Sequence, residues 1–437
     1  MFKVKTIHYL LSAMLAVGAV ACVPIEQQVQ SNSATQTALR YQDYVYDTSI
    51  QSVQAYVATG FEEEVLEAPV VPISQSEPII LEFDRLNATP QRLVAKLIHC
   101  DANWAPSTLS DTQFLNEFNE FFITDAQNSI NTRVPYVHYR FQVPRVKLSG
   151  NYLIVVQEEG GGLLLSQRLI VYQELVTVAS KLGAALGPQG RETRQPVEFN
   201  VFYADYEIIN PAAEVKAVVR QNLRWDNAKQ IARPTYVHDA QRRLEYVFFE
   251  PKELFKGLSE FRAFDSRSLN FNGIGIASIN LQENPVGVTL QPDKSRAGLA
   301  YSQDPDVNGK RIFGNRQYGN GDVNGDYAWV QFVLKASEKA PGEVYIQGEL
   351  TNWNQTSESK MTFDPSISAY TGRMLLKQGY YNYFYTLKAA ANAPDDSYFE
   401  GSHFETNNTY DILIYYRPPG SRADLIIGYD KFYFNRR

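Results

Sequence analysis

Apolar and polar residues alternate in short runs along most of this 437-residue chain, and clusters of turn-forming residues separate the runs. Runs of about four to eight residues with this alternation predict half-buried β-strands. In the first half of the chain, we expect strands at 79–83, 93–98, 136–141, 152–157, 163–172, 197–203 and 213–221. Further strands are expected at 244–249, 274–281, 327–334, 342–347, 372–376, 380–387 and 411–416.

One segment has helical spacing instead. Residues 111–122 carry apolar side chains at Phe114, Leu115 and Phe118, and Asp111 stands where a helix N-cap belongs. We therefore expect a short helix here. The glycines at 160–162 lie between two predicted strands and no helix follows them, so they predict a hairpin turn and not a phosphate-binding loop.

The residue composition supports a chain built from strands. It holds 28 Tyr and 24 Phe but only 4 Met, and aromatic residues favour half-buried pleated surfaces. The expected fold class is all-β, with tandem immunoglobulin-like β-sandwich domains and few short helices. The net charge of −7 argues against a basic nucleic-acid-binding face and disfavours adhesion to anionic lipid by charge alone.

The first residues have the pattern of an export signal. Lys3 and Lys5 precede an apolar run at 9–21 that is shorter than the roughly 20 residues of a membrane-spanning helix. The run ends in small residues before Cys22, which resembles a bacterial lipobox. We expect residues 1–22 to be a lipoprotein signal peptide and Cys22 to be the lipid anchor. The alternative is an ordinary secretory signal with a chance cysteine.

The rest of the chain divides into a tether and about three domains. Residues 23–44 are rich in Gln, Ser, Thr and Asn, so they predict a flexible tether. We expect a first β-sandwich at 45–176, a second at 177–289, a loop-rich connection at 290–326 and a third sandwich at 327–437.

Cys100 is the cysteine that remains when Cys22 is assigned to lipid. A lone thiol in an oxidising compartment could be reactive, but Cys100 ends a predicted strand, where a small buried side chain is expected. Stability is therefore expected to come from packed cores and not from disulfides.

The sequence holds few of the groups that catalysis requires. Beyond the signal, its histidines are His99, His138, His238 and His403, with no pair at metal-ligand spacing. His138 lies in an alternating strand, where it points to solvent or takes a satisfied core position. No nucleophile elbow occurs, and the acidic runs at 62–64 and 158–159 are typical of solvated loops. We expect no catalytic residues and no cofactor.

Two acidic loops, at 304–309 and 322–326, have the alternating oxygen ligands that a calcium ion requires. The positions that would complete an EF-hand are Asn315 and Val333 instead of glutamate. Asn-Gly and Asp-Gly pairs also serve in hairpin turns. We expect structural turns at both loops, with an incidental ion as the alternative, and assign no metal ligands.

A linked series of short motifs runs through the first predicted sandwich. It comprises His99-Cys100-Asp101 with Trp104 and Pro106, then 116–122, Asn131-Thr132, 135–139 and 149–152 (SGNY), and it continues at 220–227 (RQNLRWDN) and 259–268 (SEFRAFDSRS). Through this series, residues 45–437 resemble the plug proteins of the type IX secretion system of the Bacteroidetes. Ser259 replaces the asparagine that this family usually carries.

The third predicted sandwich has a resemblance of its own. Residues 344–353 (VYIQGELTNW) and 379–384 (GYYNYF) are similar to early-set immunoglobulin-like modules related to glycogen-binding domains. Exposed aromatic residues in such modules stack on sugar rings, so Trp353 and Tyr381 are the residues through which the chain would bind a glycan. The other interpretation is that both residues complete the core or its rim, because a fold does not determine a function.

The resemblance to plug proteins implies a non-enzymatic function. The protein would dock on the periplasmic opening of the type IX outer-membrane translocon and seal the channel when no substrate is being exported. Its partner would be the translocon barrel, and its location the periplasmic face of the outer membrane, anchored through a lipid on Cys22. A glycan-binding outer-membrane lipoprotein is the alternative, and a structural scaffold subunit of an envelope machine is a third interpretation.

Overall fold

The computed structural model describes residues 38–61, 64–87, 89–184, 187–389 and 393–435. Within these ranges, the protein is built almost entirely from strands, with a few short helical turns. The expected all-β class is therefore confirmed. No helix in these ranges is long and apolar enough to cross a membrane. The expected signal peptide and Cys22 lie outside the described residues.

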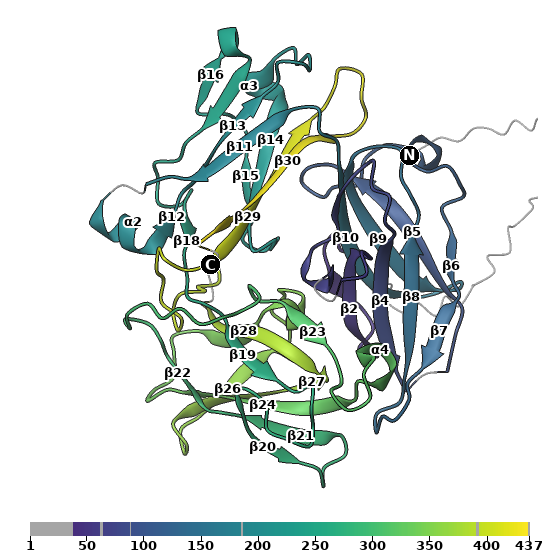
Figure 1. Ribbon diagram of the computed structural model, residues 1–437, viewed down its shortest axis with the longest axis vertical. Coiled ribbons are helices and arrows are strands. Elements are labelled where there is room, and N and C mark those ends of the chain that lie inside the picture. Colours follow the sequence, from purple (N-terminus) through teal and green to yellow (C-terminus); the bar gives the residue numbers. More distant parts are fainter. Residues whose placement is uncertain (1–37, 62–63, 88, 185–186, 390–392, 436–437) are drawn as a thin grey trace, which may run out of the picture. The chain divides into compact units, whose positions relative to one another are not determined.

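The first sandwich has two sheets with a shared core (Figure 1). One sheet runs in the order β1 (Tyr44–Val45), β10 (Leu163–Tyr172), β9 (Gly150–Glu158), β5 (Leu93–Cys100) and β6 (Phe121–Ile123), and β3 (Val70–Pro72) also pairs with β10. The other runs β2 (Ile50–Val57), β4 (Ile79–Leu86), β8 (Tyr136–Val143) and β7 (Asp125–Asn128). Two turns of helix, η1 (Glu64–Leu66) and α1 (Asp111–Phe114), lie in the connections. Side chains such as Leu81, Phe83, Leu97 and Ile154 form the core.

The second sandwich also has two sheets, and each of these has four strands. One runs β11 (Thr177–Leu182), β13 (Val197–Phe202), β17 (Arg243–Tyr246) and β16 (Tyr236–His238). The other runs β15 (Lys229–Ile231), β14 (Val215–Gln221), β29 (Asn408–Tyr416) and β30 (Leu425–Phe434). The connections of this sandwich contain a short two-stranded ribbon of β12 (Arg194–Gln195) and β18 (Phe255–Lys256). They also contain three short helical turns, α2 (Pro188–Thr193), α3 (Pro211–Glu214) and η2 (Asp239–Gln241).

The third sandwich follows one hydrogen-bonded path of strands around its core. The path runs β19 (Arg262–Asp265), β28 (Gly379–Lys388), β25 (Glu343–Gln347), β26 (Lys360–Asp364), β27 (Ala369–Lys377), β24 (Tyr327–Lys335), β21 (Val286–Leu290) and β20 (Ile276–Asn280). Off this path, β22 (Asp293–Lys294) pairs with β24 and β23 (Arg311–Phe313) pairs with β28. The helical turns are α4 (Gly321–Asn324) and η3 (Glu349–Thr351).

The second sandwich is completed by the last strands of the chain. β29 pairs with β14 in a register that places Val215 opposite Tyr416, and Figure 1 shows β29 and β30 beside β14. The third sandwich is therefore inserted between β18 and β29. This differs from the expected boundaries, which placed 274–281 in the second unit and 411–416 in the third. Sequence order was misleading because alternation predicts a strand but does not identify its partner.

The expected connection at 290–326 is part of the third sandwich. Although this stretch is rich in loops, its strands β22 and β23 add to the sheet of that sandwich, and α4 packs near β8 of the first. The loops are therefore fixed on both sides by strands and do not separate two domains.

The expected helix at 111–122 is wrong beyond its first turn. α1 begins after Ser110, which is its N-cap, and the chain soon straightens into β6. The side chain of Asn119 donates to the Leu97 carbonyl at 2.8 Å and accepts from the Leu97 N–H at 2.9 Å. Because these bonds satisfy the edge of β5, the segment runs along the sheet instead of coiling.

The last residues of the expected tether pack on the first sandwich. Ser166 Oγ donates to the Gln42 carbonyl at 2.7 Å, and the Arg168 N–H donates to Asp43 Oδ1 at 2.6 Å. Residues 38–44 therefore belong to the folded body, which corrects that end of the prediction. The other expected tether residues lie outside the described ranges.

Candidate functional site: the seams between the sandwiches

The first and second sandwiches meet over an apolar contact, which we call the first–second seam. Strands β9 and β29 line it with every second side chain, while the intervening side chains fill the core of each sandwich. Burial on both faces explains the continuous apolar runs at 152–156 and 412–416. The buried residues of the seam are Cys100, Ala102, Trp104, Leu153, Val155 and Ile170 from the first sandwich, and Val218, Leu413, Tyr415 and Ile426 from the second.

Polar residues of the motif series also contribute to the first–second seam. Asn151 accepts a hydrogen bond from the Tyr415 hydroxyl at 2.9 Å and donates to the Asp101 carbonyl at 2.9 Å. The Asp101 carboxylate in turn accepts from the Asp424 N–H at 3.2 Å and lies 2.8 Å from Arg417. The motifs at 99–101 and 149–152 thus join two sandwiches.

Gly150 in the same motif has a steric role. Its φ is +153°, and a Cβ on it would lie 2.3 Å from Nε2 of His99. A side chain here would therefore displace the buried His99 ring, which packs edge-on against Tyr152 at 5.0 Å. Burial lowers the pKa of His99, so the ring is held neutral.

Arginine and tryptophan side chains form a stack at the edge of this seam. Arg220 on β14 forms a buried ion pair with Asp411 on β29, with Nε 3.0 Å from Oδ1, and lies 4.5 Å from the ring centre of Trp225. Trp225 meets Trp104 edge to face, with ring centres 5.0 Å apart. Arg168 of the first sandwich lies over both rings, at 4.5 and 5.0 Å. Each guanidinium is paired with an aromatic face that attracts it.

The same segment reaches the third sandwich through Arg224. This fully buried side chain donates to Asp226 at 2.6 Å and to Asp396 at 2.9 Å, and it lies 4.5 Å from the ring centre of Trp353. Burial by itself lowers the pKa of the Arg224 guanidinium, but the two carboxylates outweigh that effect and raise the pKa. Residues 220–227 therefore contact all three sandwiches.

The first and third sandwiches meet over a mainly polar contact, which we call the first–third seam. At its centre, the buried Asp84 carboxylate accepts from Lys377 Nζ and from the Tyr327 hydroxyl, both at 2.7 Å. His138 Nδ1 lies 2.8 Å from Asp84, and the Tyr327 hydroxyl also lies 2.6 Å from that of Ser52. The apolar part of the seam is small and comprises the buried residues Val134, Tyr136 and Tyr327.

The acidic loop at 322–326 binds the Asn131-Thr132 motif across the first–third seam. The Asp326 carboxylate accepts the backbone N–H groups of Arg133 at 2.9 Å and Val134 at 3.1 Å. Asn131 donates to Asn324 at 3.2 Å. The side-chain oxygens of Asn324 and Asp326 are thus used in hydrogen bonds between two sandwiches.

The other acidic loop is closed by hydrogen bonds of its own. Asp306 accepts the backbone N–H groups of Phe261 and of Asn308, the latter at 3.0 Å. Burial raises the pKa of Asp306 to about 7. The contacts of both loops are those of structural turns.

A cavity of about 240 Å³ lies where the three sandwiches meet. Its walls carry charged side chains of both signs, among them Asp43, Arg220, Lys310 and Glu349. Burial raises the pKa of Asp43 and lowers that of Lys310, so both groups are shifted toward their neutral forms. A polar cavity of this size has room for several water molecules.

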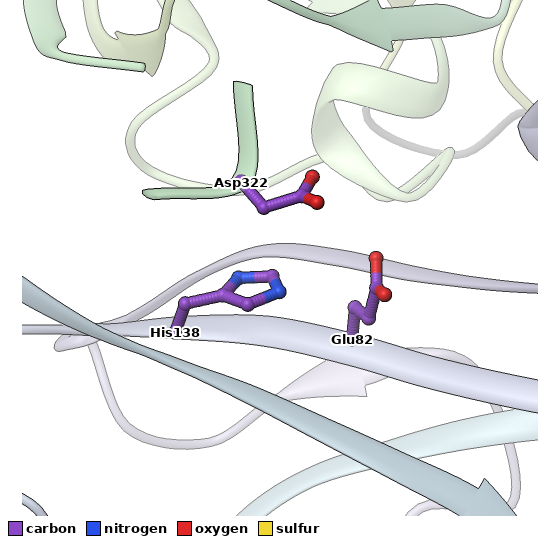
Figure 2. A group of neighbouring side chains, drawn as sticks. All are labelled: Glu82, His138 and Asp322. Carbon is purple, nitrogen blue, oxygen red and sulfur yellow. The ribbon is translucent and has the colours of Figure 1, made fainter. Parts of the chain in front are cut away.

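Three side chains on the first–third seam could hold a metal ion. Glu82, His138 and Asp322 each offer one ligand atom, and these atoms lie within 4.8 Å of one another. Figure 2 shows the three side chains turned toward a shared space. The sequence does not reveal this group, because the three positions have no ligand spacing and come together only when two sandwiches meet.

The aromatic residues considered for glycan binding do not present exposed ring faces on which a sugar could stack. Tyr381 is only 1% exposed. Trp353 is half-buried, packs edge-on against Phe261 with ring centres 6.0 Å apart, and has the Arg224 guanidinium over its ring. These positions favour the interpretation of both residues as parts of the core and its rim.

Cys100 has the environment of a structural thiol. It is buried in the first–second seam, and burial raises the pKa of its thiol to about 12. Because the thiolate is the reactive form, this residue is inert at neutral pH. Among the other histidines, His238 pairs with Glu245 at 2.7 Å.

Comparison with known proteins assigns a family to the first sandwich. Residues 50–173 match the family described as the type 9 secretion system plug protein 1st domain. Among solved structures, a hypothetical protein from Parabacteroides merdae ATCC 43184 is 28% identical to this chain and superposes with a TM-score of 0.85. The match covers 91% of this chain and 100% of that chain. No curated protein matches the sequence.

These findings define a protein of joined β-sandwiches whose arrangement is shared with the Parabacteroides protein over nearly the whole chain. Residues 50–173 are a plug protein first domain of the type IX secretion system, as the motif series predicted. This domain associates the protein with type IX secretion and with a periplasmic or outer-membrane-associated location, and it favours a non-enzymatic role. The early-set resemblance of the third sandwich stays a prediction.

Proposed function

We propose that this protein is a stopper that docks on the periplasmic opening of the type IX outer-membrane translocon and seals the channel while no substrate is being exported. The observation that carries the proposal is the plug domain at 50–173, joined to two further sandwiches by buried contacts. Sealing by excluded volume needs a folded obstacle whose parts do not slide past one another. The Asp84–Lys377 pair, which joins the first and third sandwiches, opposes such sliding, because separating it leaves a buried charge without its partner.

We further propose that a lipid on Cys22 anchors the protein to the periplasmic leaflet of the outer membrane, with the residues up to position 37 as the tether. A tether keeps a released stopper at high effective concentration beside the channel. The docking contact is expected to bury on the order of 1,200 to 2,000 Å², the size of a specific interface that can still dissociate.

Affinity purification tests the docking step. The tagged full-length protein is isolated from its own outer membranes in mild detergent, and the co-eluting proteins are identified by mass. A stopper should bring down a barrel protein of very large mass. Recovery of the protein alone, or with sugar-uptake components, would contradict docking and favour the glycan-binding alternative.

A permeability assay tests the sealing step. Cells that lack the protein should take up more of a bulky hydrophilic dye than the parent cells, and the full chain supplied in trans should restore the barrier. The variant Cys22→Ala separates sealing from lipid anchoring. At high expression it should still seal the channel, because the proposed anchor only raises the local concentration of the protein beside the channel. Equal uptake in cells with and without the protein would refute sealing.

A further inference from the structure

Two neighbouring strands of the first sandwich present a cluster of ionisable side chains to the third. In the antiparallel pair β4 and β8, Glu82 stands opposite Arg140 and Asp84 opposite His138. Because side chains two positions apart share a face, these four point to the same side, away from the core residues between them. Asp322, in α4 of the third sandwich, lies over this face (Figure 2).

The imidazole ring of His138 is oriented as that of a metal-binding histidine would be. Its side chain is 7% exposed, and its Nδ1 lies 2.8 Å from Asp84. Since Asp84 already accepts from Lys377 and Tyr327, it is a carboxylate acceptor, and Nδ1 must carry the proton. In the neutral imidazole, Nε2 then carries the lone pair, and the described residues provide no hydrogen-bond donor for it. A carboxylate that fixes the far nitrogen of an imidazole is the usual outer-sphere support of a metal-bound histidine.

The charges around the cluster do not cancel. The carboxylates of Glu82, Asp84 and Asp322 face it, and the cations are Arg140, 3.2 Å from Glu82, and Lys377, 2.7 Å from Asp84. With a neutral imidazole, one negative charge is therefore left over, on the half-buried Asp322 beside two buried side chains, where an unpaired charge is costly. The nearby Asp326 is occupied by backbone N–H groups.

Glu82 keeps the capacity for one more partner. Its Oε1 accepts from Tyr56 at 2.9 Å and from Arg140 at 3.2 Å, while Oε2 accepts only from Gln54 at 3.1 Å. A carboxylate offers about four lone-pair sites, so Oε2 retains one. Among the described residues, the Asp322 carboxylate has no hydrogen-bond donor of its own.

We propose that Glu82, His138 and Asp322 form a binding site for a single divalent transition-metal ion of the Zn²⁺ type at the first–third seam. One imidazole nitrogen with two carboxylate oxygens suits Zn²⁺, whereas Ca²⁺ and Mg²⁺ prefer oxygen ligands alone. Ligands of one tetrahedral Zn²⁺ lie about 3.4 Å apart, so the group must contract from its present 4.8 Å limit. Asp322 can make that movement because α4 is a single short turn.

The ion would join two sandwiches, since two ligands come from the first and one from the third. It would also neutralise the excess negative charge, so the ion and the Asp84–Lys377 pair would stabilise the same contact. This inference concerns the seam itself and does not depend on what the whole protein docks on.

Calorimetric titration of the full chain tests the site. The protein is freed of metal with a chelator, dialysed and titrated with Zn²⁺ alone. We expect one Zn²⁺ per chain, and slower hydrogen exchange at 130–136 and 321–327 when it binds. Asp322→Asn keeps the size and backbone contacts of the residue and should weaken Zn²⁺ binding at least about tenfold. Glu338→Gln, at an exposed carboxylate of the same sandwich, is the matched control and should bind as the parent does.

Two results would overturn the proposal. One is the absence of stoichiometric Zn²⁺ binding by the parent protein. The other is binding that survives Asp322→Asn but is lost in His238→Ala, which would place the ion at the half-exposed His238–Glu245 pair of the second sandwich instead. Binding that is lost in Asp322→Asn and kept in His238→Ala supports the site.

Discussion

The first sandwich contacts the second through apolar side chains and the third through mainly polar ones. The first–second seam buries aromatic and aliphatic side chains such as Trp104, Leu413 and Tyr415. The first–third seam buries few apolar residues and relies on the hydrogen bonds of Asp84 and Asp326. Apolar burial contributes about 25 cal/mol per Å² whatever the local geometry. A hydrogen bond contributes only about 0.5–1.5 kcal/mol net, and losing one partner costs more than that.

The two seams should therefore open in different ways. The apolar seam shares strands β9 and β29 with two cores, so it should open only when those cores unfold. The polar seam also uses strands of a core, β4 and β8, but across the seam it depends on a few hydrogen-bonded groups around Asp84 and buries little apolar surface. It should therefore open locally while each sandwich stays folded.

The largest effect is expected from Arg220→Met. The change leaves Asp411 buried without its cation and removes the guanidinium from the Trp225 ring. We expect the free energy of unfolding to fall by about 3–5 kcal/mol, measured from the midpoint of urea denaturation. The control is Arg373→Met, which also removes a guanidinium from a tryptophan ring, that of Trp329, but whose ion pair with Glu283 is half-exposed and should be worth at most about 1 kcal/mol. Equal midpoints for the two variants would show that the stack does not stabilise the seam.

A smaller and more local effect is expected from Lys377→Met. Asp84 loses its cation but keeps His138 and Tyr327, so the loss should be about 2–3 kcal/mol. Hydrogen exchange should quicken at 130–136 and 321–327 and stay slow in β9 and β29. Faster exchange throughout the protein would contradict local opening of the polar seam.

Tyr327→Phe should cost about 1 kcal/mol. It removes the hydroxyl that connects Asp84 with Ser52 and leaves the ring packed edge-on against Tyr136. Combined with Ser52→Ala, the loss should be less than the sum of the single losses, because both changes remove one shared bond. Urea denaturation of the three variants measures this, and full additivity would mean that the bond adds nothing.

An effect confined to part of the pH range is expected from Asp306. Burial raises the pKa of this residue from its ordinary 3.8 to about 7, so the folded protein holds the proton more tightly than the unfolded chain does. This contribution to stability is complete below about pH 4 and is lost as the pH rises through 7. The parent should therefore lose more stability than Asp306→Asn between pH 5 and pH 8. Parallel pH profiles from thermal denaturation would exclude this role.

Much of the strand content could be predicted from local pattern. The strand expected at 163–172 has those bounds in β10, and the glycine turn before it joins β9 to β10 as a hairpin. Alternation works here because each strand buries a defined face. The run at 111–122 misled prediction because its phenylalanines fit helical spacing, whereas the bonds of Asn119 to β5 keep it extended.

The candidate sites were only partly predictable. The motif series pointed to residues 99–101, 149–152 and 220–227. The sequence does not reveal that these segments lie on the seams, because their partners, such as Tyr415 and Trp353, are far away along the chain. His138 was expected either at the surface or in a satisfied core position. It is buried, and only one of its ring nitrogens has a partner among the described residues.

The insertion of the third sandwich into the second sets an order for biosynthesis. Arg220 and Asp411 are 191 positions apart, so β14 must wait for its partner until the residues between them have been made. Pairing over such a distance is slow and late. A product that stops before Asn408 leaves an open strand edge and an unpaired buried arginine, which mark it for aggregation or proteolysis. The second sandwich can therefore close only when β29 and β30 are present.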